Sequence, residues 1–327
     1  MYYQPLAPRK KDRCNILTCA FGVLALGFGF VAYTIHKTEA QWGGKKLWND
    51  FKAQPFTAAT HTQMTAMSVC LNEKEVVVAQ TSFAFVTVLT NNFDKYGAAA
   101  AKLGLSLKQH TAMDRIMFEL QGSPIPENVR RKQIEVGWKI CIVSGKAGKV
   151  HAWALTEYEG VVLLDADILA LRTPVDLFVQ HLTQMKSVSM KVGAVRNHPS
   201  SLGSNNDDGG CSWLPIRSPF NMGVLLVEPH KATWERLQES VYDDEALHRF
   251  FQSQIYELPL VYNAMTDMRA CEPTAWYANR HEFRLMHYTM SKPWTYSVHK
   301  YWRAPVELLS CWFWGVEDYC VLWDLIQ

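Results

Sequence analysis

Two aspartates lie one residue apart at the end of a short apolar run. The run is VVLL at 161–164, and it is followed by Asp165-Ala166-Asp167. A run that is apolar at every position is typical of a strand buried on both faces of a parallel sheet. Side chains two residues apart in an extended chain point the same way. We therefore expect both carboxylates to face one crevice beyond the carboxyl end of a central strand, where open α/β sheets bind ligands.

Two carboxylates held this close repel each other unless a cation lies between them or one is protonated. Carboxylate oxygens are hard ligands that suit Mn²⁺ or Mg²⁺, and these ions complete their shells with substrate phosphates. An Asp-x-Asp triplet alone is also common in solvated turns. Its surroundings favour a metal site, because Lys149-x-x-x-Trp153 leads into the strand and Pro174-x-Asp176-Leu177-Phe178 follows it.

The whole stretch 149–178 resembles the core of glycosyltransferase family 8, the glycogenin-like retaining transferases. The lysine-to-tryptophan lead-in and the DAD triplet recur there in this order. Further motifs of that family follow the same order in this chain: AFVTVLTNN and GLSLKQH within 84–110, FNMG at 220–223, YDDEAL at 242–247, LPLVYN at 258–263, and a histidine five residues before KPW at 292–294. The resemblance covers about residues 82–296.

The resemblance implies a role for each matching residue. It implies Mn²⁺, with Mg²⁺ as the alternative, held by Asp165, Asp167 and His287. It implies a donor site formed by Thr90, Asn91, Lys149, Asp165, Asn221 and Lys292. It implies catalytic roles for Asp243, Asp244, Glu245 and Lys292.

The chain departs from the family pattern at four positions. Met222 replaces a serine or threonine, and Met290 stands near a family glycine. Asp94 stands where the family has a tyrosine, which leaves Phe93 or Tyr96 to stack on the uracil. The fourth departure is Glu245.

Glu245 stands where the family has a glutamine near the anomeric carbon. A carboxylate there is a competent nucleophile for a covalent glycosyl intermediate. Alternatively, it hydrogen-bonds a sugar hydroxyl or pairs with an arginine. We favour the second interpretation.

The N-terminus predicts a membrane anchor. Residues 14–35 are 22 residues without a charge, and at ~1.5 Å per residue they span the ~30 Å hydrocarbon core. Arg9, Lys10, Lys11 and Arg13 precede them, whereas only Lys37 follows closely. The positive-inside rule then leaves 1–13 in the cytoplasm. A cleaved signal peptide is the alternative, although its apolar region is usually shorter.

The rest of the chain has ordinary globular composition. It has 327 residues, of which 48% are hydrophobic and 20% charged, and its net charge of +2 gives no reason to expect nucleic acid as a partner. Predicted strands at 83–89, 116–118, 139–143, 161–164 and 191–195 alternate with predicted helices at 97–107, 127–136 and 232–237. This alternation predicts an α/β fold with a central, mostly parallel sheet, and the resemblance implies a single Rossmann-like domain of the glycosyltransferase-A type.

The predicted organisation has five parts. These are a cytoplasmic tail at 1–13, a transmembrane signal anchor at 14–35, a stem at 36–81, the glycosyltransferase domain at 82–300, and a Trp-rich segment at 301–327 that packs on the domain or rests on the membrane. The polar loop at 197–219 contacts the acceptor or is a floppy insert. Eight cysteines are present, and Cys141 lies in an apolar run that favours a buried thiol over a disulfide.

The predicted function is Mn²⁺-dependent transfer of a sugar from a UDP-sugar to an unidentified glycan, lipid or protein, with retention. The predicted location is a Golgi or other secretory-pathway membrane, as a single-pass type II protein with a lumenal catalytic domain. Two alternatives stay open. A catalytically silent sugar-nucleotide-binding protein would show no slow UDP-sugar hydrolysis, and a metal-dependent nucleotidyltransferase would release pyrophosphate.

Overall fold

The computed structural model describes residues 70, 80–145, 148–197, 219–289 and 292–295. The predicted tail, anchor and Trp-rich segment lie outside these residues, as do Met290 and most of the stem and of the 197–219 loop. None of the helices in the described ranges has both the length and the apolar character that a membrane span requires.

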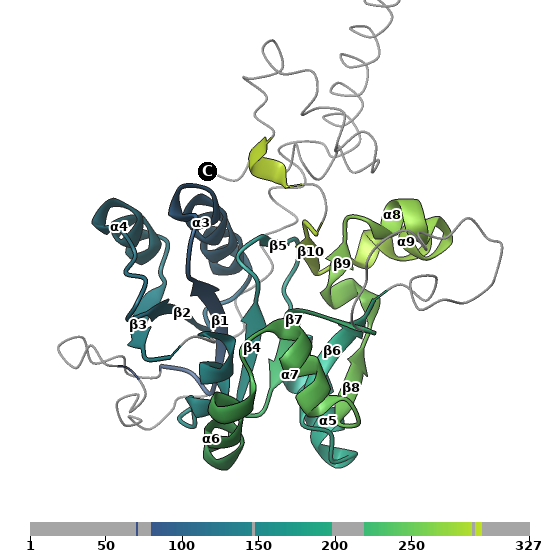
Figure 1. Cartoon of the computed structure of the whole chain (residues 1–327). Coiled ribbons are helices and arrows are strands. Elements are labelled where there is room, and N and C mark those ends of the chain that lie inside the picture. The colour runs from purple at the N-terminus through teal and green to yellow at the C-terminus, as the bar shows by residue number, and fades with distance from the viewer. Residues whose placement is uncertain (1–69, 71–79, 146–147, 198–218, 290–291, 296–327) are drawn as a thin grey trace, which may run out of the picture. The chain divides into compact units, whose positions relative to one another are not determined.

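The central feature is a seven-stranded sheet in the order β3-β2-β1-β4-β7-β6-β8 (Figure 1). Its strands are β1 (Phe83–Leu89), β2 (Asp114–Leu120), β3 (Lys139–Val143), β4 (Gly160–Leu164), β6 (Val192–Arg196), β7 (Phe220–Val227) and β8 (Ile255–Leu258). The pairs β3–β2, β2–β1, β1–β4 and β6–β8 are parallel, whereas β7 is antiparallel to both of its neighbours. The predicted α/β class with a large, mostly parallel sheet is confirmed.

Helices cover both faces of this sheet (Figure 1). They are α3 (Phe93–His110), α4 (Glu127–Glu135), α5 (Thr183–Ser187), α6 (Lys231–Ser240) and α7 (Asp244–Phe251). On β4, Val161 and Leu163 face the cluster that contains α6 and α7 residues, and Val162 and Leu164 face the cluster beneath α3. All five β4 residues are buried, which explains why the run is apolar at every position.

A second, smaller sheet lies beside the end of β4. It has the order β5-β10-β9, with β5 (Ile168–Ala170), β9 (Ala264–Met265) and β10 (Leu285–His287). Helices α8 (Met268–Cys271) and α9 (Pro273–Asn279) adjoin it (Figure 1). Because β5 begins one residue after Asp167, this sheet brings the distant segment 285–287 to the aspartates.

Two predicted elements differ from the structure. The strand predicted at 116–118 extends to both sides as β2, and the extensions include polar residues that are nevertheless buried: Asp114 and Glu119 are 4% and 2% exposed. The helix predicted to begin at Gly97 begins at Phe93, after Asn92 adopts the left-handed region with φ 46°. Neither the added polar residues of β2 nor the first turn of α3 follows an apolar period in the sequence.

The interpretation of Cys141 as a buried thiol is wrong. Cys141 is buried in β3 as expected, but it forms a disulfide with Cys70 across 71 residues of sequence. This bond attaches residue 70, from the predicted stem, to the sheet. Cys271 is also disulfide-bonded.

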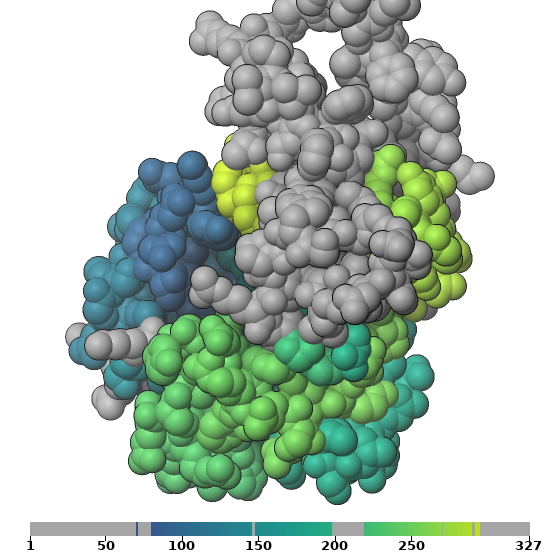
Figure 2. Space-filling view, turned by 45° about the vertical axis from the view of Figure 1, so that its right-hand side comes forward, coloured from purple at the N-terminus to yellow at the C-terminus, as the bar shows by residue number. Residues whose placement is uncertain are grey.

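In the space-filling view, the first strand-and-helix unit (blue) and the surface of α6 and α7 (green) adjoin each other (Figure 2). The last described residues (yellow) lie against the α3 region, where the Tyr96 and Trp294 rings meet at 4.8 Å. The motifs that follow β1 and β4 meet at the carboxyl ends of these two parallel strands.

Candidate active site

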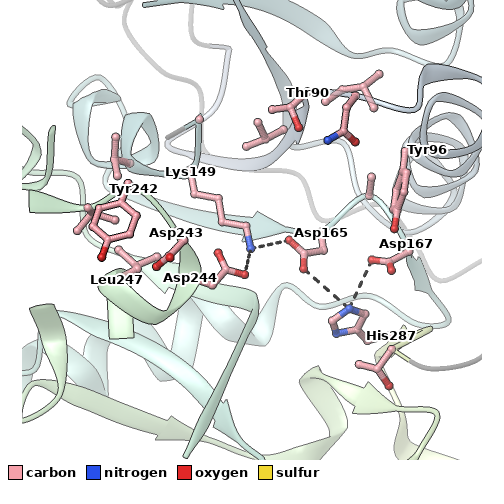
Figure 3. Close-up of a pocket in the computed structure, with 18 of the residues that line it drawn as sticks. Thr90, Tyr96, Lys149, Asp165, Asp167, Tyr242, Asp243, Asp244, Leu247 and His287 are labelled. Atoms are coloured by element: carbon pink, nitrogen blue, oxygen red, sulfur yellow. Dashed lines mark hydrogen bonds and ion pairs between the residues drawn. The ribbon is translucent and has the colours of Figure 1, made fainter. Parts of the chain in front are cut away.

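Asp165 and Asp167 follow β4 directly, and neighbouring strands fix the turn that carries them. The Asp165 backbone N–H donates to the Gly223 carbonyl at 2.8 Å, and the Asp167 carbonyl accepts from the Tyr288 N–H at 3.1 Å. Both carboxylates line one cavity of about 500 Å³ (Figure 3). The structure thus places both on one crevice at the end of a central strand, as their spacing predicts.

His287 reaches the two aspartates through the small sheet. It pairs with Ile168, the residue after Asp167, in the antiparallel ladder between β10 and β5. Its Nε2 lies 3.4 Å from Asp167 Oδ1 and 3.9 Å from Asp165 Oδ2, and Figure 3 shows the ring between them. One ligand atom from each of the three residues falls within 4.8 Å of the others.

Two lysines neutralise the outer oxygens of the same carboxylates. Lys149 Nζ lies 2.8 Å from Asp165 Oδ1 and 2.9 Å from Asp244 Oδ2. Lys292 Nζ donates to Asp167 Oδ2 and, at 2.7 Å, to the Tyr288 carbonyl. Each aspartate therefore turns one oxygen to a lysine and the other toward His287.

This charge pattern keeps the aspartate and the lysine ionised. Burial favours the neutral form of Asp167, but His287 in its protonated form and the Lys292 ammonium outweigh it and hold the pKa of this carboxyl well below its usual range. Burial likewise opposes the charge on Lys149, but Asp165 and Asp244 outweigh it and raise the pKa of this ammonium. Asp167 is thus a carboxylate at neutral pH, which is the form that binds a cation.

The three residues fit a divalent ion. An octahedral ion with ligands at about 2.1 Å places neighbouring ligand atoms about 3 Å apart. The separations of 3.4 and 3.9 Å from His287 Nε2 are slightly wider, so small side-chain rotations suffice to reach that spacing. Two carboxylates and an imidazole form a predominantly hard donor set. The group meets the requirements of a metal site, and its oxygens already face one another.

Thr90 and Asn91 line the same cavity. They follow β1, which is the parallel neighbour of β4, so the two strands end side by side. Both aromatic residues left open for stacking pack against the core beneath α3, but of the two, only Tyr96 is among the described residues that line the cavity. The structure therefore favours Tyr96 for that contact.

The opposite end of the cavity is formed by the start of α7, where Tyr242, Asp243 and Asp244 contribute to the lining (Figure 3). Asp243 also caps α7, since its Oδ1 accepts from the Ala246 N–H at 2.7 Å. Asp243 thus has a structural role beside its predicted one, and Asp244 is joined to the metal cluster through Lys149.

Glu245 does not belong to the described lining of this cavity. Its Oε1 pairs with Arg249 Nη1 at 2.7 Å, one helical turn on, and its side chain is 44% exposed. This agrees with the interpretation that Glu245 pairs with an arginine, and the structure offers nothing that favours a nucleophilic role.

Glu245→Gln is therefore expected to keep sugar transfer or donor hydrolysis within about tenfold of wild type, a change near 1.4 kcal/mol in activation free energy. Asp244→Asn, which alters a cavity-lining neighbour, is the comparison and is expected to lower turnover more. A thousandfold loss in Glu245→Gln, or a glycosyl adduct on Glu245 in intact-protein mass spectrometry, would establish the covalent route instead.

Asn221 differs from the expectation that it binds the donor, and the neighbouring Met222 lies in the core. Asn221 is not among the described residues that line the cavity, and its Oδ1 accepts from the Gly223 N–H and from Asn263 Nδ2, each at 2.9 Å. The Met222 side chain is 6% exposed within the core, and only its carbonyl meets Lys149. The departure from the family's serine or threonine at 222 therefore lies in the core and leaves the cavity wall unchanged.

Sequence reasoning assigned no role to Asn263, although it closes the LPLVYN motif. It is fully buried, and its Oδ1 lies 3.0 Å from His287 Nδ1. The pairing of β9 with β10 creates this contact. In the sequence, the only signal for a role of Asn263 was its place in the LPLVYN motif.

The structure combines a mostly parallel α/β sheet with a possible aspartate–aspartate–histidine metal site at the strand ends, which is where open α/β sheets bind ligands. No protein-family profile matches the chain. The chain is 27% identical to glycogenin-1 of Oryctolagus cuniculus over an alignment of 251 residues, and the match covers 66% of this chain and 67% of that protein. It is 28% identical to glycogenin-1 of Homo sapiens over an alignment of 216 residues, and that match covers 56% of this chain and 53% of that protein. Among solved structures, it is similar to the galactosyltransferase LgtC in complex with donor and acceptor sugar analogs, with 18% identity, a TM-score of 0.41, and coverage of 69% and 94%.

The glycogenin relatives confirm two predictions made from the motifs. The chain is a glycogenin-like protein, and its class of enzyme is a glycosyltransferase. The individual roles of the site residues remain predictions.

Proposed function

We propose that this protein transfers a sugar from a UDP-sugar to an acceptor with retention at the anomeric carbon, and that it depends on Mn²⁺ or, alternatively, Mg²⁺. One observation carries the proposal. Asp165, Asp167 and His287, from segments about 120 residues apart, turn one ligand atom each toward a common point in a cavity at the carboxyl end of the sheet. Retention rests on the resemblance to family 8.

The bound ion would supply charge stabilisation to the departing diphosphate. Asp165, Asp167 and His287 would hold it. Lys292 and Lys149 already lie beside these carboxylates, so each ammonium is within a short side-chain movement of a phosphate bound next to the ion. Together they would offset the negative charge that develops when the bond to the sugar breaks.

The remaining lining divides by position along the cavity. Thr90, Asn91 and Tyr96 would bind the uridine, with the Tyr96 ring stacked on the base. Asp244 and Asp243, at the α7 end, would accept hydrogen bonds from sugar hydroxyls. In this arrangement the sugar would lie beside α7 and the diphosphate beside the aspartates.

The test is hydrolysis of a panel of UDP-sugars by the full chain, with and without Mn²⁺ and in the absence of an acceptor. We expect slow, Mn²⁺-dependent release of UDP from at least one donor, with the configuration of the released sugar retained in an NMR time course. Binding without release would indicate a silent binding protein. Pyrophosphate release from a nucleoside triphosphate would indicate a nucleotidyltransferase.

We also propose that residues 14–35 anchor the protein as a single-pass type II protein of a Golgi or other secretory-pathway membrane, with the catalytic domain in the lumen. The uncharged segment and the basic residues before it support this. The disulfide-bonded cysteines support it independently, because disulfides persist in oxidising compartments.

In sealed microsomes, a C-terminal tag on the full chain is expected to resist added protease until detergent is present. The lumenal orientation predicts this result because the membrane then separates the tag from the protease. A cytoplasmic N-terminal tag is the matched control and should be digested at once. Digestion of the C-terminal tag in intact vesicles would refute the proposed topology.

A further inference from the structure

We propose that Asn263 is a positioning residue that holds His287 in one tautomer, with the proton on Nδ1 and the Nε2 lone pair turned to Asp165 and Asp167, and that Asn221 in turn holds Asn263. The relay consists of Asn221, Asn263 and the ring of His287. It deepens the proposed function, because it rests on His287 being a metal ligand there.

The direction of every hydrogen bond in the relay follows from one backbone group. The Gly223 N–H can only donate, so the side-chain atom of Asn221 that lies 2.9 Å from it is the carbonyl Oδ1. The same Oδ1 is 2.9 Å from the Asn263 side chain, which must therefore present its NH₂ group. The other end of that amide is then the Asn263 oxygen, and it lies 3.0 Å from His287 Nδ1. This contact is shorter than the 3.4 and 3.9 Å that separate Nε2 from the two carboxylates, so a neutral ring donates from Nδ1 to the nearer acceptor and leaves Nε2 unprotonated.

The relay is closed to solvent at its centre. Asn263 is fully buried and His287 is 4% exposed. A buried amide that loses a partner has no water to replace it, and an unsatisfied buried polar group is costly. The other tautomer would set the unprotonated Nδ1 against the Asn263 oxygen and leave that buried oxygen without its donor.

The absence of a side chain at Gly223 leaves room for the His287 ring. A Cβ atom on Gly223 would lie 2.3 Å from His287 Cε1 and 2.7 Å from Nδ1. The ring thus packs directly on the backbone of β7, beside the residue whose N–H begins the relay. The glycine of the FNMG motif is explained by this close approach, and the asparagine of the same motif by the hydrogen bond to Asn263.

The consequence concerns the metal. With Nδ1 occupied by Asn263, the nitrogen that faces Asp167 Oδ1 at 3.4 Å and Asp165 Oδ2 at 3.9 Å is the basic one. Outer partners that orient a ligating histidine typically change metal affinity by about 10- to 100-fold when removed. We expect an effect of this size from Asn263, although it touches neither ion nor substrate.

The test measures the tautomer of His287 and the affinity for Mn²⁺ separately. In metal-free full-length protein labelled with ¹⁵N-histidine, at a pH where the ring is neutral, long-range ¹H–¹⁵N spectra are expected to show the proton on Nδ1. Asn263→Leu, which keeps the size but removes the acceptor, is expected to lose this preference and to bind Mn²⁺ about 10- to 100-fold more weakly in an EPR titration. Asn263→Asp restores an acceptor and is expected to bind Mn²⁺ more tightly than Asn263→Leu.

Thr266→Val is the matched control. Thr266 is fully buried, and its N–H donates to the His287 carbonyl, but the hydrogen bond described for its hydroxyl is with Thr289 and not with the ring. The control should keep the tautomer and the affinity of wild type. A wild-type ring protonated on Nε2, unchanged Mn²⁺ affinity in Asn263→Leu, or an equal loss in Thr266→Val would each overturn the proposal.

The test still gives an answer if Asn263→Leu does not fold or if wild-type protein does not bind Mn²⁺. If Asn263→Leu does not fold, the wild-type tautomer and the behaviour of Asn263→Asp still decide the question. If wild-type protein does not bind Mn²⁺, the proposed function fails, whereas the tautomer measurement still tests the relay.

Discussion

Asp167→Asn is expected to lower Mn²⁺-dependent turnover of a UDP-sugar by at least about a thousandfold, which corresponds to about 4 kcal/mol of lost transition-state stabilisation. Asn keeps the size of the side chain but is a poorer ligand for a hard cation, and its neutral amide no longer offsets the ion's charge. The fold should persist, because an amide oxygen can still accept the hydrogen bond from Lys292 and the backbone bond from Tyr288 is unaffected.

Asp176→Asn is the control for that experiment. Asp176 also pairs with a cation, since its Oδ2 lies 2.9 Å from Arg284 Nη2, but it does not belong to the described lining of the cavity. Its loss should leave Mn²⁺ dependence unchanged. Full activity of Asp167→Asn at limiting Mn²⁺ would show that the metal is held elsewhere.

Lys292→Met is expected to have opposite effects on catalysis and on metal binding. Turnover should fall by roughly 10²–10³, the loss typical of a group that stabilises developing negative charge. Affinity for Mn²⁺ without nucleotide should rise severalfold, because Lys292 competes with the ion for the charge of Asp167. A kinetic assay at saturating Mn²⁺ and an EPR titration separate the two quantities.

Lys186→Met is the matched lysine control. Lys186 pairs with Glu228 at 3.1 Å on the surface and lies outside the described lining of the cavity, so neither turnover nor Mn²⁺ affinity should change. A Lys292→Met protein that loses Mn²⁺ affinity would contradict the competition and would indicate that Lys292 supports the shape of the metal site.

The fold was predictable where a strand is apolar along its whole length. The strand at 139–143 has the predicted limits, and the run at 161–164 is β4 with one added glycine. The fold was not predictable where buried polar residues extend a strand. Asp114 in β2 is buried because Lys139 Nζ and the Tyr158 hydroxyl reach it at 2.6 and 2.9 Å, and local sequence carries no signal for such distant partners.

The same distinction applies to the site. The convergence of Asp165 and Asp167 follows from the period of an extended chain, and the pairing of Glu245 with Arg249 follows from helical spacing. His287 needed the family resemblance, because only the antiparallel pairing of β10 with β5 brings it there. Asn263, and the bond between Cys70 and Cys141, depend on pairings between distant segments, and no local pattern anticipates either one.

The central claim is that Asp165, Asp167 and His287 hold an ion that also binds the diphosphate of the donor. Calorimetric titration of UDP into the full chain, with and without Mn²⁺, tests this most directly because coupling between two ligands of one site must appear in both affinities. We predict that Mn²⁺ tightens UDP binding at least about tenfold, a coupling near 1.4 kcal/mol, and leaves binding of uridine, which lacks the phosphates, unchanged. Equal affinity for UDP with and without Mn²⁺ would contradict the account.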